Sequence, residues 1–194
     1  IGIVDYGSGN IFSVSKCLMK LGYDVEISNN AAKLMSCDGL ILPGVGAFGD
    51  AARQLKNYKM DTLVFDYVKT GKTLLGICVG MQLLLEDSSE FGVHKGLGII
   101  TGNLRKIKFS KDVRCKVPVV CWRKVTFTAN TLMDTGFDNK AMNSFYFVHS
   151  YSAHGINDEN LAAVYSVGNE NIVAMIKKNN VFGVQFHPER SGES

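Results

Sequence analysis

Residues 76–84, GICVGMQLL, place a cysteine between two glycines where an apolar run turns into helical sequence. A cysteine that only fills a core needs no glycines beside it. A nucleophile on a sharp strand-to-helix turn needs them, because neighbouring backbone must pass close to it. The following helix adds the field of its N-terminus, which favours a thiolate over a thiol. The stretch therefore predicts a nucleophile elbow with Cys78 at its apex and the Val79 N–H in one half of an oxyanion hole. The alternative is a small core cysteine at a strand end.

The sequence around this elbow alternates between strand and helix patterns over residues 1–85. An apolar run at 1–5 ends in the glycine-rich turn YGSGN, and apolar residues then recur at helical spacing from Ile11 to Leu21. Further strand patterns cover 23–28, 39–44 and 73–78, and helical patterns cover 47–67 and 79–85. Strands that alternate with helices predict a parallel sheet with right-handed crossovers.

The second half of the chain is richer in strand patterns. They cover residues 98–109, 114–122, 124–128, 144–151, 161–167, 172–178 and 181–189, with polar turns between several of them. No linker, repeat or low-complexity tract divides this half from the first. We therefore predict one α/β domain over 1–194, in which a mostly parallel central sheet carries helices on both faces and extra strands from the C-terminal half. A further helix is expected beyond the final SGES.

Composition limits the classes of partner. Of 194 residues, 21 are basic and 18 acidic, and a net charge of +3 with scattered basic residues does not favour nucleic acid or a membrane surface. The longest apolar run, 73–85, is shorter than the roughly 18 residues of a membrane span, and the first ten residues have no basic signal-peptide region. Five cysteines, an odd number without a CxxC pair, predict free thiols and a cytoplasmic setting.

A cysteine nucleophile needs a base, and histidine is the usual one. Of the four histidines, His187 ends an apolar strand in the segment GVQFHPE, and α/β sheets place their sites at such strand ends. Glu189 follows two residues later, with Pro188 fixing the backbone between them. This spacing predicts a carboxylate that accepts from one ring nitrogen and leaves the other for Cys78.

A glycine-rich loop, LPGVGAFGD at 42–50, follows the strand at 39–44. The sheet order expected from alternating strands and helices would bring residues 43–46 beside the elbow. Glycines there permit the backbone to turn an N–H toward a developing oxyanion. A plain strand-to-helix turn is the alternative, although it needs one glycine and not three in six residues.

Two other site types fit the sequence poorly. The segment DYGSGN resembles a dinucleotide-binding loop, but Phe12 stands where the third glycine of G-x-G-x-x-G would be. No cysteine–histidine cluster has the spacing of metal ligands. Neither a metal nor another cofactor is therefore expected.

With Cys78, His187 and Glu189 in this order, the chain resembles the class I (triad) glutamine amidotransferases. The similarity runs from the first strand through the glycine loop, the elbow, the segments KGLG and FYFVHSY, and the final GVQFHPERSG. The resemblance implies a flavodoxin-like domain that hydrolyses glutamine to glutamate and ammonia. Cys78 would attack the γ-carboxamide, His187 would act as base and then acid, and Glu189 would orient it.

The same resemblance implies roles for further residues. Val79 and a backbone N–H of Gly44, Val45 or Gly46 would hold the oxyanion. The residues that match positions gripping the substrate glutamine are Gln82, Glu90, His149, Ser150 and Tyr151.

Several motifs resemble, within the class, those glutaminase subunits that form a heterodimer with a (β/α)₈ cyclase in histidine biosynthesis and deliver ammonia to it through a tunnel. Asn10, Trp122 and Arg123 match positions that face this partner, and the 43–46 loop is expected to rearrange when the partner binds. One segment departs from the pattern, since Cys121 and Arg123 replace a glycine and an asparagine. Paralogues that aminate a nucleotide-linked sugar in surface-polysaccharide assembly therefore stay an alternative, as do a cysteine peptidase and a non-catalytic binding subunit.

Overall fold

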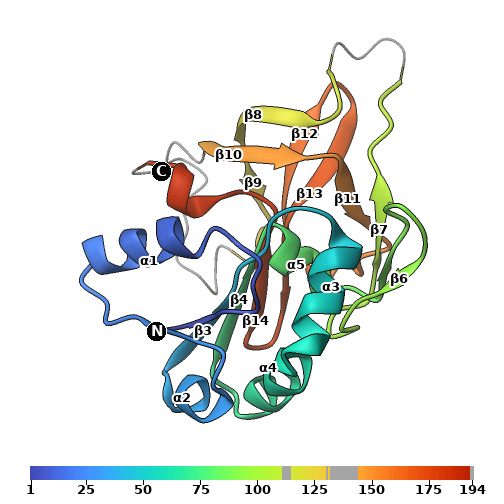
Figure 1. Ribbon diagram of the computed structural model, residues 1–194. Helices are drawn as coiled ribbons and strands as arrows, with labels where there is room; N and C mark the ends of the chain where they lie inside the picture. Colours follow the sequence, from blue (N-terminus) through green and yellow to red (C-terminus); the bar gives the residue numbers. More distant parts are fainter. Residues whose placement is uncertain (111–114, 130, 132–143, 193–194) are drawn as a thin grey trace.

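The computed structural model describes residues 1–110, 115–129, 131 and 144–192. Its centre is an eight-stranded sheet with the strand order β2-β1-β3-β4-β14-β13-β12-β9 (Figure 1). The strands are β1 (Gly2–Val4), β2 (Glu26–Ser28), β3 (Gly39–Leu42), β4 (Thr73–Ile77), β9 (Thr126–Phe127), β12 (Leu161–Val167), β13 (Glu170–Lys178) and β14 (Val181–Val184).

The sheet combines a parallel half with an antiparallel half. Strands β2, β1, β3, β4 and β14 are parallel neighbours, and this order is that of flavodoxin-like folds. Strands β13, β12 and β9 continue the sheet with antiparallel pairing. The predicted parallel sheet, extended by strands of the C-terminal half, is confirmed.

Helices cover both faces of the parallel half, as right-handed crossovers require. Figure 1 shows α1 (Ile11–Lys20) on one side, and α3 (Phe48–Asn57) and α4 (Met60–Lys69) on the other. The helical pattern at 47–67 is divided because Lys59 lies in the left-handed region, with a φ of 56°. The short helix α2 (Ala31–Ser36) was not predicted, although Asn30 caps it by accepting from the N–H groups of Ala32 and Lys33.

Two smaller sheets flank the carboxyl ends of the parallel strands. One pairs β8 (Val119–Lys124) with β10 (Ser144–His149), and the other contains β5 (Asp87–Ser88), β6 (His94–Lys95), β7 (Asn103–Lys106) and β11 (Tyr151–His154). The strand predicted over 98–109 is reduced to β7, since Gly98 and Gly102 both have positive φ and bend the backbone before it. Of the strand predicted over 114–122, Arg114 lies outside the described residues.

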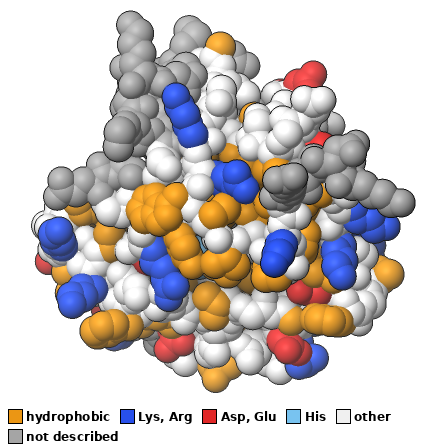
Figure 2. Space-filling view, turned by 90° about the horizontal axis from the view of Figure 1, so that it is seen from above, with side chains coloured by type: hydrophobic (Ala, Val, Ile, Leu, Met, Phe, Trp, Pro, Cys, Tyr) orange, Lys and Arg blue, Asp and Glu red, His pale blue; other side chains and the backbone are white. Residues whose placement is uncertain are grey.

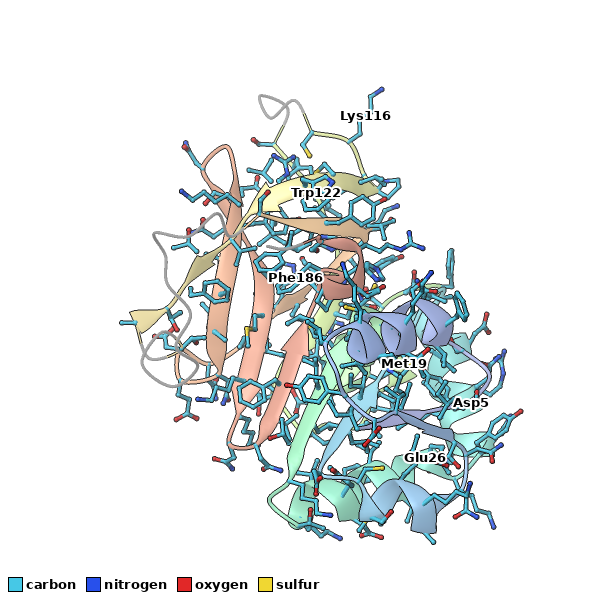
Figure 3. All side chains as sticks on the ribbon, turned by 90° about the vertical axis from the view of Figure 1, so that its left-hand side faces the viewer. Asp5, Met19, Glu26, Lys116, Trp122 and Phe186 are labelled. Atoms are coloured by element: carbon cyan, nitrogen blue, oxygen red, sulfur yellow. The ribbon has the colours of Figure 1, made fainter. Side chains whose placement is uncertain are left out.

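The buried core lies between the central sheet and the helices and continues beneath the small sheets. Aromatic rings join the two regions, since Phe186, which follows β14, stacks on Phe145 of β10 with ring centroids 4.1 Å apart. Figure 3 shows Phe186 below β8, the strand that carries Trp122. Among the described residues, no helix combines the length and the apolar character needed to cross a membrane.

Candidate active site

The elbow lies between β4 and α5 (Val79–Leu83), in the middle of the central sheet. Cys78 has a φ of 54° and a ψ of −110°, a conformation that non-glycine residues rarely adopt. Two backbone hydrogen bonds hold it: its N–H donates to the Val184 carbonyl at 2.8 Å, and its carbonyl accepts from the Gln82 N–H at 3.1 Å. Such strain costs on the order of 1–3 kcal/mol and is typical of functional sites. The conformation is the one predicted for a nucleophile elbow.

The glycines of the elbow are required by close contacts between backbones. A Cβ on Gly80 would lie 1.8 Å from the Leu42 carbonyl oxygen, and one on Gly76 would lie 2.7 Å from the Gly80 oxygen. A Cβ on Gly44 would lie 2.7 Å from the Gly80 nitrogen. The prediction that the glycine loop lies beside the elbow is therefore confirmed, because β3 and β4 are adjacent and their carboxyl ends touch.

The candidate base comes from the neighbouring strand. Val184 of β14 pairs with Ile77 of β4, so the chain after β14 ends beside Cys78. The His187 N–H donates to the Tyr146 carbonyl at 2.9 Å, which fixes the backbone of the histidine. The imidazole is buried, and its Nδ1 donates to the Glu189 Oε1 at 2.9 Å. Only Nε2 is left for the thiol of Cys78.

The proton affinity of His187 reflects both neighbours. Burial alone disfavours the imidazolium, but hydrogen bonding and charge interaction with Cys78 and Glu189 outweigh it and raise the pKa of His187 from 6.5 to about 9. Nε2 nevertheless makes no hydrogen bond of ordinary geometry with a described atom. Nε2 therefore lies near the Cys78 sulfur without a fully formed hydrogen bond to it.

This pKa predicts how stability depends on pH. The folded state holds the His187 proton more tightly than the unfolded chain, so the associated stabilisation is complete below pH 6.5 and is lost as the pH rises to about 9. A rise of this size corresponds to on the order of 3 kcal/mol. We expect Glu189→Gln to lower the free energy of unfolding more at pH 6 than at pH 9.5, as measured by denaturant titration. An equal loss at both pH values would contradict the assigned ion pair.

Two hydrogen bonds from the turn after β1 hold the glycine loop in place. The buried Tyr6 hydroxyl donates to the Pro43 carbonyl at 2.6 Å, and the Ser8 hydroxyl donates to the Val45 carbonyl at 3.1 Å. Val45 and Gly46 reach the cavity, whereas Gly44 is wedged against the elbow. The loop thus presents backbone close to Cys78, as an oxyanion hole would require.

These elements enclose a cavity of about 310 Å³. Its lining includes most of the site residues predicted from sequence, together with two that were not predicted, Pro118 and Val148. The full lining is Val45, Gly46, Cys78, Val79, Gln82, Glu90, Pro118, Val148, His149, Ser150, Tyr151 and His187. Within the described part of the chain, no group of three or more histidine, cysteine or acidic side chains could hold a metal ion.

Two of the predicted substrate-binding side chains are fixed by contacts within the protein. Glu90 accepts from the Phe48 N–H through Oε2 at 2.7 Å, at the start of α3. His149 contacts the Tyr151 carbonyl through Nδ1 at 2.8 Å and the Tyr165 hydroxyl through Nε2 at 2.9 Å. Burial, assisted by the nearby His187 and opposed by the Tyr151 contact, lowers the pKa of His149 to about 4. His149 is therefore neutral, with Nδ1 as donor and Nε2 accepting from Tyr165.

The three residues predicted to face a partner differ in exposure. Trp122 is 50% exposed and packs edge-on against Tyr146, whereas Asn10, at the start of α1, is half-buried. Arg123 is also half-buried, and its guanidinium donates to the Cys115 sulfur at 3.4 Å. Arg123 and Cys121 both lie near the Tyr165 hydroxyl, which is the partner of His149. The two residues that depart from the family pattern thus lie on the inner side of β8.

Sequence reasoning missed the buried residues that hydrogen-bond to the site from within the core. Tyr6, Tyr165 and Gln185 are fully or almost fully buried, and each hydrogen-bonds to a site residue or to the glycine loop. The available signal was a polar residue within an apolar strand pattern, as with Gln185 in GVQFHPE.

Comparison with known proteins agrees with this geometry. The family model "Glutamine amidotransferase class-I" matches residues 2–194. Among solved structures, "Structure of PurLQS from Thermotoga maritima" superposes with a TM-score of 0.72 at 23% identity, over 97% of this chain and 87% of that chain. "Crystal structure of glutamine amidotransferase" gives 0.70 at 18% identity, over 97% and 90%. At these identities, the two structural similarities show a shared fold and nothing further.

Closer relatives are found by sequence. The imidazole glycerol phosphate synthase subunit HisH of Bacillus velezensis is 43% identical over 99% of this chain and 90% of its own length. HisH of Bacillus subtilis is 42% identical over 98% and 89%, and HisH of Chlorobium luteolum is 38% identical over 99% and 93%. The chain therefore belongs to the class-I glutamine amidotransferases and, within them, to the family of imidazole glycerol phosphate synthase subunit HisH.

Proposed function

We propose that this chain is the glutaminase subunit of an imidazole glycerol phosphate synthase, which hydrolyses glutamine to glutamate and ammonia for histidine biosynthesis. The observation that carries the proposal is the arrangement of Cys78, His187 and Glu189. A strained elbow presents the thiol to a cavity, a buried imidazole faces the thiol, and a carboxylate holds the far nitrogen of that imidazole. This is the nucleophile–base–orienter pattern of acyl-transfer enzymes.

The reaction follows from these positions. Cys78 Sγ attacks the carbon of the γ-carboxamide while His187 Nε2 takes the thiol proton. The negative charge that develops on the amide oxygen is stabilised by the N–H of Val79 and by a backbone N–H of the loop at 44–46. His187 then protonates the leaving nitrogen, so that ammonia departs and a thioester remains. A water molecule, deprotonated by His187, hydrolyses the thioester to glutamate and free thiol.

Glu189 keeps the imidazole in the tautomer that this sequence of steps needs. Its Oε1 accepts from Nδ1, which leaves Nε2 as the atom that exchanges protons with sulfur and substrate. The carboxylate also stabilises the imidazolium formed after each proton transfer. Glu189 therefore acts through His187 and does not touch the substrate.

The far end of the cavity suits the amino acid part of glutamine. Gln82 and Glu90 contribute an amide and a carboxylate to its lining, and Ser150 and Tyr151 contribute the opposite wall. A carboxylate is the natural partner of an α-ammonium group, and amide groups suit an α-carboxylate. We assign Gln82, Glu90 and residues 149–151 to substrate binding.

The proposed partner is a (β/α)₈ cyclase subunit, which forms a heterodimer with this chain and receives the ammonia. Val45 and Val148 at the cavity are exposed apolar side chains, as are Val120 and Trp122 on β8. Figure 2 views the molecule from above, and hydrophobic side chains gather near the centre of this face with lysine and arginine side chains around them. Such a patch supports a protein partner. The small net charge of +3 and the scattered basic residues favour neither nucleic acid nor a membrane surface. Five free cysteines support a cytoplasmic location.

The amino-sugar route is the second candidate for the ammonia acceptor. Cys121 and Arg123, which motivated it, pack toward Tyr165 rather than outward, so they change the support of His149 more than the outer face. Identities of 38–43% to HisH proteins over nearly the whole chain favour the histidine route. A cysteine peptidase or an inactive binding subunit finds no support of this kind.

The proposal predicts activation by the partner. We expect the isolated chain to release glutamate from glutamine slowly, and addition of a cyclase subunit from a HisH-containing synthase to raise the rate at least 100-fold, because the loop at 43–46 has to complete the oxyanion hole. Release of imidazole glycerol phosphate in the presence of the cyclase substrate identifies the acceptor. High activity of the chain alone would contradict the activation. Glutaminase activity without this product would favour the amino-sugar route.

A further inference from the structure

Behind the nucleophile lies a buried amide to which the mechanism assigns no role. Gln185 follows β14 directly, and its side chain is fully buried. Its Nε2 donates to Cys78 Sγ at 3.7 Å, and its Oε1 accepts from the Gln82 Nε2 at 3.0 Å. A continuous chain of contacts thus runs from a candidate substrate-binding side chain to the reacting sulfur.

Packing alone does not account for this residue. Val184 and Phe186 on either side of it are apolar and buried, and a buried amide costs free energy unless its donors and acceptor are satisfied. The two side-chain hydrogen bonds of Gln185 both lead to the site, one to Cys78 in the elbow and one to Gln82 in the helix that follows it. Its backbone N–H donates to the Ala174 carbonyl at 2.9 Å, so the side chain is projected from a fixed strand.

We propose that Gln185 is a residue of the glutaminase site that stabilises the reactive form of Cys78 and orients the Gln82 amide. The catalytic part of this inference rests on the proposed glutaminase function. The N–H of Gln185 stabilises negative charge on the sulfur, while His187 takes the proton. Because the Oε1 of Gln185 accepts from the Gln82 Nε2, Gln82 is held in one orientation, with its second N–H and its carbonyl oxygen left for the substrate.

Other charged and titratable groups around the sulfur are few. His187 faces it from the end of β14, and the Tyr6 hydroxyl is near it but donates to the Pro43 carbonyl. Glu90 lines the same cavity from the segment after β5. Of these, His187 can donate to sulfur and Glu90 can only repel a thiolate, whereas Gln185 is an uncharged side chain that already donates a hydrogen bond to the sulfur.

Alkylation of Cys78 by iodoacetamide tests the role of Gln185 without requiring glutamine turnover. The rate is followed as a function of pH by mass spectrometry of the peptide that contains Cys78. Loss of a hydrogen bond to a charged group shifts such a profile by about one pH unit. We expect Gln185→Met to move the midpoint upward by about this amount, and Gln185→Glu to move it further, because a carboxylate of the same size repels the thiolate.

Two controls separate this role from a structural one. Asn160→Leu removes another buried amide, which donates to the Lys177 carbonyl at 2.9 Å and does not line the cavity, and it should leave the profile unchanged. Gln185→Glu preserves size and the acceptor for Gln82, so it supplies a second variant of different chemistry beside Gln185→Met. Thermal unfolding of each variant shows which alkylation profiles come from folded protein.

The link to Gln82 is tested by a double-mutant cycle in the complex with the cyclase. We expect Gln185→Met to lower kcat for glutamine about tenfold or more, and Gln82→Met to raise KM. The double variant should lose less than the product of the two single effects, since both remove the same contact. Multiplicative effects would overturn the orienting role.

Unchanged alkylation profiles in folded Gln185→Glu and Gln185→Met would overturn the role toward Cys78. These outcomes differ from a failure of the proposed function. If the wild type alkylates normally and the variants shift, but no glutamine is hydrolysed with any cyclase, then Gln185 supports the thiol of a site with another substrate.

Discussion

Replacement of Cys78 by alanine is expected to reduce glutamine hydrolysis by at least three orders of magnitude while the protein stays folded. Among the described residues that line the cavity, Cys78 is the one that carries a thiol. Loss of a covalent nucleophile commonly has effects of this size or larger. The substitution leaves the backbone strain at residue 78 unchanged, because alanine is as unfavourable as cysteine at a φ of 54°. Glutamate release in the presence of the cyclase, measured at saturating glutamine, checks the expectation.

A matched variant shows that the loss is specific to this thiol. Cys37→Ala removes another free cysteine, which follows α2 and contacts the Lys33 carbonyl at 3.5 Å. We expect its glutaminase rate to stay within about twofold of the wild type. Turnover by Cys78→Ala at a tenth of the wild-type rate or above would exclude the covalent mechanism.

Replacement of Gly80 by alanine is expected to have the largest effect on stability. The added methyl group would lie 1.8 Å from the Leu42 carbonyl oxygen and 2.8 Å from its carbon, and both atoms belong to the backbone of β3. Neither side can yield without separating the elbow from the glycine loop. Overpacking in a well-packed interior costs about 1–3 kcal/mol, and a clash between backbones lies at or above the upper end. We expect a fall in Tm of roughly 6 °C or more for a domain of this size, or failure to fold.

Gly39→Ala, on the strand β3 that Gly80 contacts, is the matched control. Its added methyl group would meet only the Thr73 carbonyl oxygen, at an ordinary 3.9 Å, and its φ is not in the left-handed region. Its Tm should therefore stay within about 2 °C of the wild type. If Gly80→Ala matched this control, the close approach of β3 and α5 would be wrong.

The sequence was most informative about features that depend both on local hydrophobic pattern and on the order of the elements along the chain. The alternation of strands and helices up to Leu85 implied parallel strands, and the order that follows from right-handed crossovers placed the glycine loop beside the elbow. His187 could be placed at a strand end because an apolar run preceded it. The pairing of β14 with β4, on which its approach to Cys78 depends, joins segments about a hundred residues apart and could be inferred only through the resemblance to a family.

The features that sequence reasoning missed depend on single residues and on contacts across the fold. Helix α2 is short and is fixed by the Asn30 cap rather than by an apolar period. The break between α3 and α4 depends on one left-handed lysine, for which no residue type gives a strong signal. Gln185 directly follows β14, and its role becomes visible only through two hydrogen-bond partners that lie more than one hundred residues earlier in the chain.

The location of β4 and β14 within the central sheet has a consequence for the tolerance of the enzyme to change. Three strands lie on each side of this pair, with β2 at one border and β9 at the other. A peptide tag or loop graft at the β9 border is separated from the sulfur by three ladders of backbone hydrogen bonds, whereas the β2 border lies next to β1, whose following turn holds the glycine loop. The β9 border is thus the side at which the chain can be altered for purification or immobilisation with little loss of turnover.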